Sequence, residues 1–467
     1  MNKVLLICPT SSVEVFSETK IRVAIPLIPY IGLASLGATL LDAGHDVKIL
    51  EQSVSKDPRG ELHSILNEYR PDFVGIGFTS FLSGEAKELA KTVKDFNGNT
   101  VVIGGGVHCS VLPEETLRDT DFDVVVIGEG EITLKEIVDR VPLEDIDGIA
   151  YKDGKTIKRT KPRELIEDLD SLPVPAWHLY DLKKYHAPRI NARRNPVGSI
   201  ETSRGCPYRC IYCNKSVFGY RFRGKSAKRI VDEMEAMLEV GFKEIHIQDD
   251  MFSMDLQRAK ATCDEIIRRG LKFPWNIYNG VRCASVDLEF FQKLKRAGCY
   301  RVSMGIESGN QEILDRIQKG ITIEQIKEAV RLAKEAGVEI LTFFLVGLPG
   351  ETEDTMRQTI EFAKELDCDL NKVAIATPIP GTPMFEEYEK KGLIRTHDWS
   401  QYQFHSKSGI AKHENLEYET IRKYYDLFYK ELYLRPHFIW KRLVRGISTG
   451  DILYDIVYFL RTLKYKW

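Results

Sequence analysis

Three cysteines stand close together in the segment Thr202-Ser-Arg-Gly-Cys206-Pro-Tyr-Arg-Cys210-Ile-Tyr-Cys213, with the spacing Cys-x3-Cys-x2-Cys. Thiolates are the usual protein ligands of iron–sulfur clusters. A cubane [4Fe–4S] cluster has four irons, so three cysteines leave one iron open to a ligand from outside the protein. A structural zinc site is the alternative, but such sites have four protein ligands, and no Cys or His pair nearby completes one.

This motif resembles the cluster-binding motif of the radical S-adenosylmethionine (SAM) enzymes. The aromatic Tyr212 before the last cysteine and the strand-like residues 197–200 before the loop strengthen the resemblance. It implies that Cys206, Cys210 and Cys213 are the catalytic ligands of a [4Fe–4S] cluster and that Tyr212 contacts the bound cofactors. It also implies that the open iron binds the amino and carboxylate groups of SAM.

The composition favours an intracellular enzyme. The chain has 467 residues, is 43% hydrophobic and 29% charged, and carries a net charge of −2. That length predicts two or three domains, and the charge gives no reason to expect a nucleic-acid partner. Nine cysteines, three of them grouped, argue for metal ligation and against a secreted disulfide framework. The first apolar run is too short for a signal peptide, and no run of about 18 apolar residues could span a membrane, so we expect a cytoplasmic protein.

The first 145 residues have the pattern of a doubly wound, Rossmann-like α/β domain. Five nearly all-apolar, strand-like runs alternate with helical patterns, which predicts a parallel sheet buried on both faces. The predicted strands are residues 4–7, 46–50, 73–78, 100–103 and 122–127, and the predicted helices are residues 31–43, 61–69, 84–96 and 113–118.

Small and polar residues follow three of these strands, at the end where such sheets bind their ligands. Glycine lets a backbone approach a large ligand closely, although it also serves tight strand-to-helix turns. Three such ends in one sheet favour the binding interpretation. The residues are Thr79, Ser80, Gly104, Gly105, Gly106, His108, Gly128, Glu129 and Gly130.

Residues 31–37, 102–109 and 123–131 resemble the cobalamin-binding domain that precedes many radical SAM cores, which implies that these strand ends bind cobalamin. No Gly-x-Gly-x-x-Gly follows the first strand, which argues against a nicotinamide-binding site. Many cobalamin domains supply a lower cobalt ligand from a His after the first strand, but no His precedes His45 here. His108 is the one local candidate, and a hydrogen-bonding or helix-capping role is favoured for it.

Residues 146–195 are predicted to form a hairpin about Asp153-Gly154 and then a Pro-rich linker. Residues 196–385 alternate six strand-like runs with helical patterns. The predicted strands are residues 197–200, 244–248, 275–278, 301–306, 339–346 and 372–376. This order predicts a partial (β/α)6 barrel of the TIM type, with its site at the carboxyl ends of the strands.

Polar residues lie at those ends. They are Gln248, Asp249 and Asp250 after the second strand, Arg282 after the third and Glu307 after the fourth. SAM carries an ammonium, a carboxylate and a ribose diol, which such side chains can pair, so we expect its contacts to come from these positions. The acids could instead cap the following helices. The family often has Gly-Gly-Glu where this chain has Gln-Asp-Asp, so which aspartate meets SAM stays open.

Residues 386–467 are predicted to form a mainly helical cap. The stretch 421–467 combines ten Lys and Arg and twelve aromatic residues with four Asp and Glu, and apolar residues follow helical spacing over 453–460. We favour a cap that closes the barrel and shapes the substrate cavity. Peripheral contact with a membrane is the alternative, and nucleic acid is the least favoured partner.

Together the resemblances cover residues 1–385 and imply a cobalamin-dependent radical SAM enzyme. Such an enzyme cleaves SAM reductively to a 5′-deoxyadenosyl radical and modifies an unactivated carbon, and we expect C-methylation. The alternatives are radical cyclisation or ring rearrangement without methyl transfer, and a non-catalytic cobalamin-binding sensor. The expected partners are a small-molecule or lipid-like substrate and an electron donor such as a flavodoxin or a ferredoxin.

Overall fold

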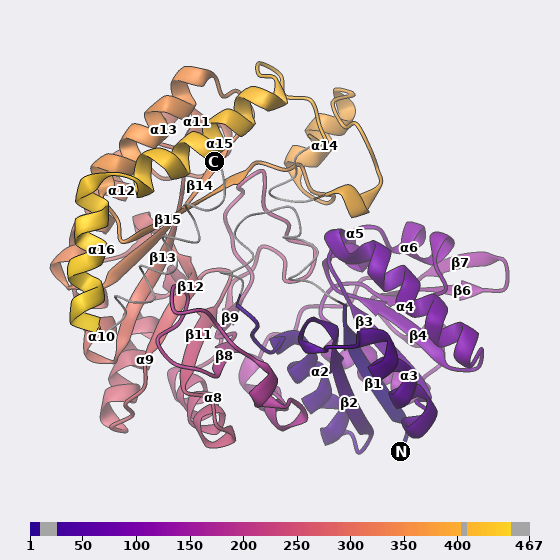
Figure 1. Cartoon of the computed structure of the whole chain (residues 1–467). Coiled ribbons are helices and arrows are strands. Elements are labelled where there is room, and N and C mark those ends of the chain that lie inside the picture. Colours follow the sequence, from indigo (N-terminus) through magenta and orange to yellow (C-terminus); the bar gives the residue numbers. More distant parts are fainter. Residues whose placement is uncertain (10–25, 403–408, 450–467) are drawn as a thin grey trace.

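The computed structural model describes residues 1–9, 26–402 and 409–449, which form two α/β units packed side by side (Figure 1). The N-terminal unit, indigo to purple, is built on one sheet, and the larger unit, magenta to orange, is built on a second. The last helices, in yellow, run along the outside of the larger unit. Over these described ranges, no helix is long and apolar enough to cross a membrane.

The N-terminal sheet confirms the predicted doubly wound fold. Its seven strands have the order β2-β1-β3-β4-β5-β6-β7, and the first five are parallel. These five are β1 (Lys3–Cys8), β2 (Asp46–Glu51), β3 (Phe73–Gly77), β4 (Val101–Gly105) and β5 (Val124–Val126). The helices are α2 (Ile31–Asp42), α3 (Pro58–Tyr69), α4 (Ser83–Phe96), α5 (Val107–Val111), α6 (Pro113–Asp119) and α7 (Glu131–Val138). Helices α5 and α7 are not among the helices predicted from the sequence.

Successive side chains of a strand point to opposite faces of its sheet, so an all-apolar strand needs cover on both sides. On β1, Leu5 and Ile7 belong to a core shared with α3 and α4, whereas Val4 and Leu6 belong to a core shared with α2 and α7. The two cores place helices on both faces and leave the carboxyl ends of the strands uncovered by them.

The hairpin about Asp153-Gly154 extends this sheet. Strands β6 (Ile149–Asp153) and β7 (Thr156–Arg159) pair antiparallel with each other, and β6 pairs antiparallel with β5. The hairpin therefore belongs to the N-terminal sheet and not to the linker region predicted for residues 146–195. The division of the chain after residues 145, 195 and 385 remains a prediction.

The second sheet is the predicted partial barrel. Its six parallel strands have the order β15-β14-β13-β12-β11-β8, so β8 and β15 are the open edges. The strands are β8 (Val197–Ile200), β11 (Glu244–Gln248), β12 (Trp275–Val281), β13 (Cys299–Glu307), β14 (Glu339–Val346) and β15 (Leu370–Ile375). The helices are α8 (Ala227–Val240), α9 (Leu256–Arg268), α10 (Leu288–Arg296), α11 (Gln311–Arg316), α12 (Ile323–Glu335) and α13 (Glu353–Leu366).

Local capping fixes where several barrel helices begin. The side chain of Ser226 accepts a hydrogen bond from the amide of Arg229 at the start of α8. Thr322 and Gln325 form the predicted capping box at the start of α12. Each cap satisfies amides that would otherwise lack partners in the first turn.

Between β8 and α8 the chain makes a long loop that holds the three grouped cysteines. A two-stranded antiparallel ribbon closes the loop at its base, formed by β9 (Ser203–Arg204) and β10 (Arg223–Gly224). The ribbon holds both ends of the loop together beside the first strand of the barrel.

The C-terminal part is helical, as predicted, with α14 (Pro383–Lys390), α15 (Tyr418–Tyr433) and α16 (Pro436–Thr449). The hydroxyls of Tyr429 and Tyr433 bond the backbone N–H and C=O groups of Val373 and Asn371 on edge strand β15. An edge strand left open is a site for unwanted pairing, so α15 protects the end of the sheet. The helical pattern over residues 453–460 lies outside the described part of the chain.

Candidate functional site

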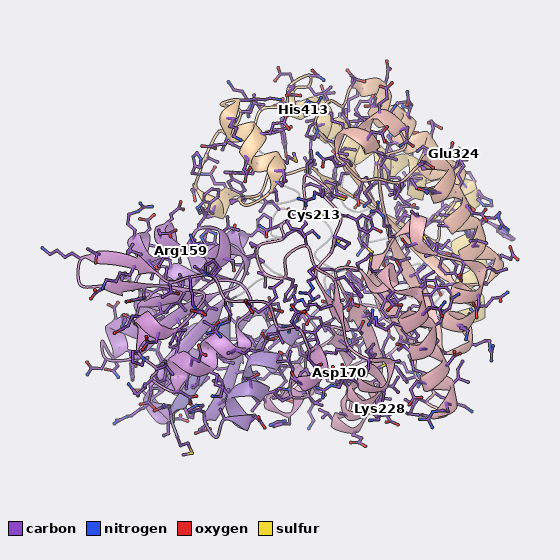
Figure 2. The ribbon with its side chains drawn as sticks, turned by 180° about the vertical axis from the view of Figure 1, so that it is seen from behind. Arg159, Asp170, Cys213, Lys228, Glu324 and His413 are labelled. Atoms are coloured by element: carbon purple, nitrogen blue, oxygen red, sulfur yellow. The ribbon has the colours of Figure 1, made fainter. Side chains whose placement is uncertain are left out.

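Distant elements hold the cysteine loop in place near the centre of the molecule, where Figure 2 shows Cys213. The amide of Ile211 donates to the carbonyl of Ile317 at 3.1 Å, and the carbonyl of Ile211 accepts from the amide of Met384 at 2.9 Å. A turn closed by the Cys213 amide and the Cys210 carbonyl, 3.1 Å apart, brings the last two cysteines together. The loop is therefore fixed by the segment after α11 and by the start of α14.

None of the three thiols forms a disulfide. Cys206 and Cys210 are buried, and Cys213 is half-buried. A hydrogen bond from Cys213 and the charge of Lys319 lower the pKa of Cys210 to about 6, against the effect of burial. The same bond and burial raise the pKa of Cys213. Among the described residues, no three His, Cys, Asp or Glu side chains converge on a single metal ion. In a cubane each thiolate binds a different iron, so three separate thiols on one loop fit that group.

Tyr212 and Glu307, both predicted to bind cofactors, meet at Lys319. The Lys319 ammonium donates to Glu307 Oε1 at 2.7 Å and to the Tyr212 hydroxyl at 3.1 Å. Glu307 has φ +69°, a left-handed conformation that is uncommon for a residue with a side chain. Such backbone strain is found where a site fixes a side chain direction. The group lies directly beside the cysteine loop.

Arg282 lies in the same region, but its guanidinium already has partners. It stacks over the Tyr208 ring at 3.5 Å and donates through Nη2 to the Gly320 carbonyl at 2.7 Å. It also donates to the carbonyl of Lys319. Arg282 thus ties β12 to the segment that carries Lys319, and a contact with the SAM carboxylate remains a prediction.

The two aspartates after β11 differ in their surroundings. Asp249 is 3% exposed and accepts hydrogen bonds from the Thr202 amide and the Ser203 hydroxyl, both at 2.6 Å. Burial raises the pKa of Asp249. Asp250 is exposed, accepts from the Gly205 amide at 3.0 Å and lines the main pocket, whereas Gln248 is half-buried. The geometry favours Asp250 for a ligand contact and gives Asp249 the role of holding the chain before the cysteines.

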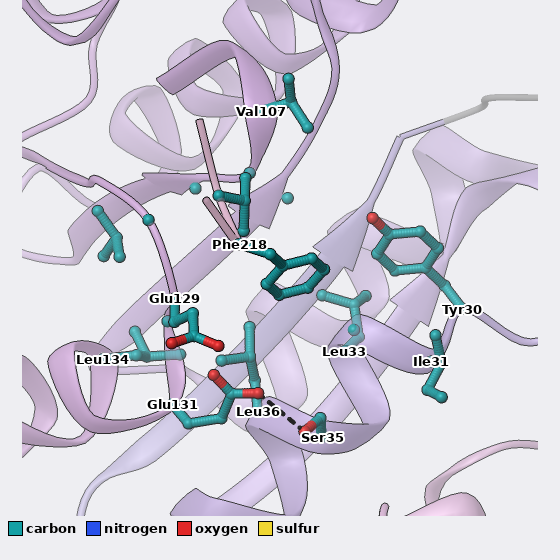
Figure 3. Close-up of a pocket in the computed structure, with 18 of the residues that line it drawn as sticks. Tyr30, Ile31, Leu33, Ser35, Leu36, Val107, Glu129, Glu131, Leu134 and Phe218 are labelled. Carbon is teal, nitrogen blue, oxygen red and sulfur yellow. Dashed lines mark hydrogen bonds between the residues drawn. The ribbon is translucent and has the colours of Figure 1, made fainter. Parts of the chain in front are cut away.

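A pocket with a volume of about 330 Å³ lies between the N-terminal sheet and the cysteine loop (Figure 3). We call it the interface pocket. It is large enough for part of a sizeable ligand. Its walls include eight predicted site residues: Thr79, Gly104, Gly105, Gly106, Gly128, Glu129, Gly130 and Asp250. Residues that the sequence analysis did not identify complete it, among them Tyr30, Glu201, Arg204, Phe218 and Lys225.

Two neighbouring glycines of this pocket have different functions. A Cβ added to Gly105 would meet no heavy atom within 4 Å, so its backbone borders open space. A Cβ on Gly106 would stand 2.7 Å from the Phe78 carbonyl oxygen, and Gly106 has φ +95°. Gly106 therefore serves the turn, whereas Gly105 leaves room for a ligand. Gly128, at φ +84°, has its nearest such atom 3.8 Å away.

Two predicted cobalamin contacts, Ser80 and His108, do not line the interface pocket. His108 Nδ1 lies 3.0 Å from the Ser80 hydroxyl, and both residues are buried. Burial lowers the pKa of His108 to about 4, so the ring is neutral near pH 7. This geometry supports the hydrogen-bonding role for His108 and gives no support to a contact between either side chain and the cofactor.

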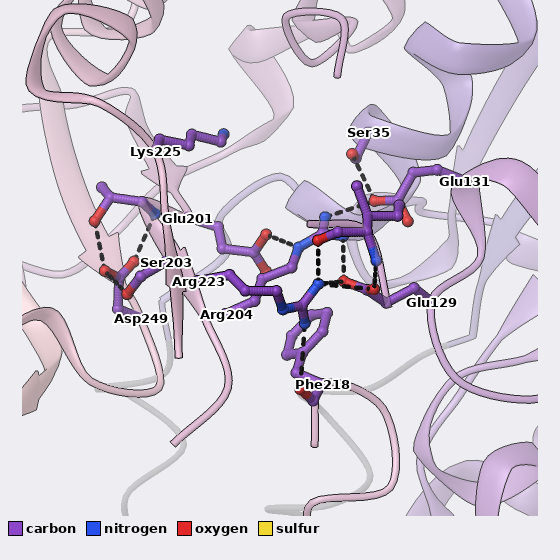
Figure 4. Close-up of polar contacts among 12 residues, drawn as sticks. Ser35, Glu129, Glu131, Glu201, Ser203, Arg204, Phe218, Arg223, Lys225 and Asp249 are labelled. Carbon is purple, nitrogen blue, oxygen red and sulfur yellow. Dashed lines mark hydrogen bonds and ion pairs between the residues drawn. The ribbon is translucent and has the colours of Figure 1, made fainter. Parts of the chain in front are cut away.

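Glu129 joins the two units through buried ion pairs (Figure 4). Arg204 Nη1 donates to Glu129 Oε1 at 2.8 Å, and Arg223 Nη1 lies 2.9 Å from both carboxylate oxygens. The Ile166 amide donates to Oε2 at 2.7 Å. The prediction that Glu129 binds cofactor is not supported by these contacts, because guanidinium and amide donors already occupy both oxygens.

Arg204 pairs with two further carboxylates. Its Nη2 donates to Glu131 Oε1 and its Nε to Glu201 Oε1, both at 2.6 Å. Burial raises the pKa of Glu201, whereas Arg204 keeps the pKa of Glu131 low against the effect of burial. Arg204 directly precedes Gly205-Cys206, which was the one sequence signal that could have marked it. Its partners lie too far away in sequence to be identified without the fold.

Two family models match the chain. The Radical SAM superfamily model matches residues 200–363, and the B12 binding domain model matches residues 23–138. The first match contains the cysteine loop and most of the barrel, and the second contains most of the N-terminal sheet.

Similar proteins include methyltransferases. An uncharacterized methyltransferase of Pyrococcus horikoshii is 36% identical, over 95% of this chain and 98% of that protein. A cytidylyl-2-hydroxyethylphosphonate methyltransferase of Streptomyces wedmorensis is 29% identical, over 87% of this chain and 85% of that protein. An anaerobic magnesium-protoporphyrin IX monomethyl ester cyclase of Cereibacter sphaeroides is 29% identical, over 80% and 62%.

Solved structures share the fold. The cobalamin-dependent SAM radical enzyme OxsB, with aqua-cobalamin and SAM bound, superposes with a TM-score of 0.73 at 18% identity. The match covers 98% of this chain and 75% of the OxsB chain. The radical SAM methyltransferase TsrM of Kitasatospora setae, with cobalamin and a [4Fe–4S] cluster bound, has a TM-score of 0.69 at 23% identity, over 93% and 82%.

Proposed function

The chain belongs to the cobalamin-binding radical SAM enzymes, and from this membership we propose that it methylates an unactivated carbon of a small-molecule substrate. Its cofactors are a [4Fe–4S] cluster, SAM and cobalamin. When bound, the cluster and SAM supply a reductively formed 5′-deoxyadenosyl radical, and methylcobalamin supplies a methyl group.

One observation carries the proposal: the interface pocket has walls from both cofactor-binding units. Gly105 and Gly128 come from the carboxyl ends of the N-terminal sheet, and Asn214 and Lys215 come from the cysteine loop. A group held by the first wall would therefore face a group held by the second. Such proximity of the two cofactors is required for a reaction in which one cofactor forms a substrate radical and the other donates the methyl group.

The protein's residues would position these groups and balance their charge. Cys206, Cys210 and Cys213 would bind the cluster as thiolates. Lys215 and Lys319 stand close to these thiols. Cys206 and Cys213 raise the pKa of Lys215, and Glu307 and then Cys210 raise the pKa of Lys319, in both cases against the effect of burial. Two cations beside three thiolates would stabilise the bound form of the loop.

For SAM, we propose contacts from the exposed Asp250, from Gln248 and from the Glu307 carboxylate. Asp250 lines the interface pocket beside the Gly205 amide, and Glu307 is fixed in direction by Lys319. Carboxylates in these places can accept from an ammonium or from ribose hydroxyls. For cobalamin, we propose the open backbone at Gly105, together with Thr79 and Gly128.

The curated relatives also support a second candidate function. Because cyclases stand among them, radical cyclisation without methyl transfer remains the alternative. The two candidates share every residue named above and differ in whether a methyl group leaves SAM. We propose methylation because a relative that matches nearly all of this chain carries the name of a methyltransferase.

The proposal also includes two partners, each given only as a class of molecule. The first is a small electron-transfer protein of the flavodoxin or ferredoxin type, which would reduce the cluster. The second is an anionic membrane surface at α16, where Trp440 is 68% and Val444 48% exposed, next to Lys441 and Arg442. Exposed apolar side chains beside basic ones are typical of interfacial helices. Binding of the full-length protein to anionic vesicles at low salt, and its loss at high salt, would test this contact.

The enzymatic proposal is tested with protein reconstituted anaerobically with iron, sulfide and cobalamin. With SAM and dithionite it should form 5′-deoxyadenosine. A protein that binds cobalamin but never cleaves SAM would support the sensor alternative instead. A matched reaction that lacks only dithionite is the control, because the radical requires an electron.

A further inference from the structure

Near the middle of two barrel strands, β14 and β15, some side chains are only half-buried. On β14 and β15, Phe343, Leu345, Lys372 and Ala374 are half-buried, whereas the residues between them are buried. Because side chains alternate along a strand, these four share one face of the sheet. Phe344, which points to the other face, packs against Phe428 of α15 with ring centroids 5.1 Å apart. The half-buried set therefore faces the lumen.

Lys372 contributes a cation to this face. Its ammonium donates to the Tyr278 hydroxyl at 3.1 Å, 5.3 Å from the centroid of that ring and 5.9 Å from that of Phe343. Within the described residues, no carboxylate forms an ion pair with Lys372. A half-buried ammonium without a counter-ion can donate charge-assisted hydrogen bonds to an anionic ligand. The nearby Arg301 is already paired with Glu339 at 3.2 Å.

Tyr278 is held rigidly behind this cation. Its ring is stacked on His246, with centroids 6.0 Å apart and planes 6° from parallel. His246 is fully buried, and its Nε2 lies 2.8 Å from Glu244 Oε1. Its Nδ1 has no hydrogen-bond partner in the part of the chain that the structure describes. The phenol therefore has a fixed position, and its hydroxyl can accept from Lys372 while it donates to a further group.

We propose that Lys372 and Tyr278 bind a carboxylate of the substrate inside the barrel, with its apolar body against Phe343, Leu345 and Ala374. The inference rests on the proposed function, because it treats the lumen as the substrate chamber. One uncompensated positive charge and two donors match a monoanion with two oxygens. A phosphoryl dianion would need a second free cation, which Arg301 does not provide while Glu339 neutralises it.

The test measures binding of small aromatic probes to the reconstituted holoprotein by ligand-observed NMR. Phenylacetate is the carboxylate, phenylacetamide its neutral analogue and phenylphosphonate the phosphoryl analogue. Wild-type protein should bind phenylacetate more tightly than both. Lys372→Met should weaken phenylacetate binding by ~10-fold or more while leaving phenylacetamide binding unchanged, because one charge-assisted hydrogen bond is lost. Tyr278→Phe should weaken it less.

The matched control is Lys155→Met, which removes an exposed lysine of the hairpin turn and should bind phenylacetate as wild type does. The inference is overturned if wild-type protein fails to bind phenylacetate or binds phenylacetamide equally well. Unchanged binding by both Lys372→Met and Tyr278→Phe would also overturn it. Tighter binding of phenylphosphonate would replace the carboxylate with a phosphoryl group. SAM cleavage by the wild-type protein is measured separately, so failure of the proposed function would be recognised independently.

Discussion

Arg204 Nη1 donates to Glu129 Oε1 at 2.8 Å, and this contact joins the start of the cysteine loop to the carboxyl end of the N-terminal sheet. Both side chains are buried, at 5% and 3% exposure. Arg204 is two residues before Cys206, and Glu129 follows the strand end that includes Gly128. A buried ion-pair network therefore connects the cysteine loop to the N-terminal sheet.

Removal of Glu129 tests this network. Glu129→Ala leaves Arg204 and Arg223 buried without their shared carboxylate, and breaking such a pair costs about 3–5 kcal/mol. We expect the free energy of unfolding, measured with urea, to fall by that amount. Glu114→Ala, which breaks an ion pair with Arg159 whose side chains are 48% and 50% exposed, should change it by less than about 0.5 kcal/mol. Equal effects of the two substitutions would contradict a structural role for the network.

Substitutions of the two adjacent glycines, Gly105 and Gly106, should affect cobalamin binding and stability separately. Gly105→Leu should fold, because its Cβ meets open space, but its side chain should occupy the interface pocket and prevent cobalamin binding. Gly106→Ala places a Cβ 2.7 Å from the Phe78 carbonyl oxygen at φ +95°, so it should lower the free energy of unfolding by roughly 1–3 kcal/mol. Visible absorption of bound cobalamin and urea unfolding separate the two effects. Normal cobalamin binding by Gly105→Leu would show that the cofactor lies elsewhere.

The cluster prediction concerns three thiols and one control. Replacement of Cys206, Cys210 and Cys213 by Ala should reduce the iron content from about four per chain to near zero and abolish 5′-deoxyadenosine formation. Cys368→Ala removes a fully buried thiol far from the loop in sequence and should leave the iron content unchanged. Iron analysis and chromatography measure both quantities. SAM cleavage by the triple variant would disprove the assignment.

Glu351 predicts a pH dependence of stability. It is fully buried, and burial raises its pKa to about 8 from an ordinary value of 4.5. The folded state then binds a proton more tightly than the unfolded state, so the free energy of unfolding falls as pH rises from 4.5 to 8. The slope is at most about 1.4 kcal/mol per pH unit. Glu351→Gln cannot ionise and should lose less stability between pH 5 and pH 8. Parallel pH profiles would show that the pKa of Glu351 is not raised.

The fold could be predicted because its signals are local. Apolar runs, the Ser226 cap and the Thr322–Gln325 capping box each depend on a few neighbouring residues, and the structure has these elements nearly where the sequence placed them. The hairpin about Asp153-Gly154 was also recognised, but its pairing with β5 was not, because strand order depends on contacts between distant segments.

The site was only partly predictable for the same reason. Strand ends gave the glycines of the interface pocket, but the sequence could not show that Asp249 is surrounded by Thr202 and Ser203 donors or that Arg282 bonds backbone carbonyls. Residue type indicates which bonds a side chain can make. The fold determines which groups lie within hydrogen-bond distance of that side chain. For Asp249 and Arg282 these groups are other residues of the protein.

The most direct test of the account counts the two products of SAM in one reaction. Holoprotein with cluster, cobalamin, SAM and dithionite is incubated anaerobically, and 5′-deoxyadenosine and S-adenosylhomocysteine are quantified by mass spectrometry. We predict both, because radical formation yields the first and removal of a methyl group from SAM yields the second. Formation of 5′-deoxyadenosine without S-adenosylhomocysteine would contradict methylation and favour cyclisation, and the absence of both would contradict the enzymatic account.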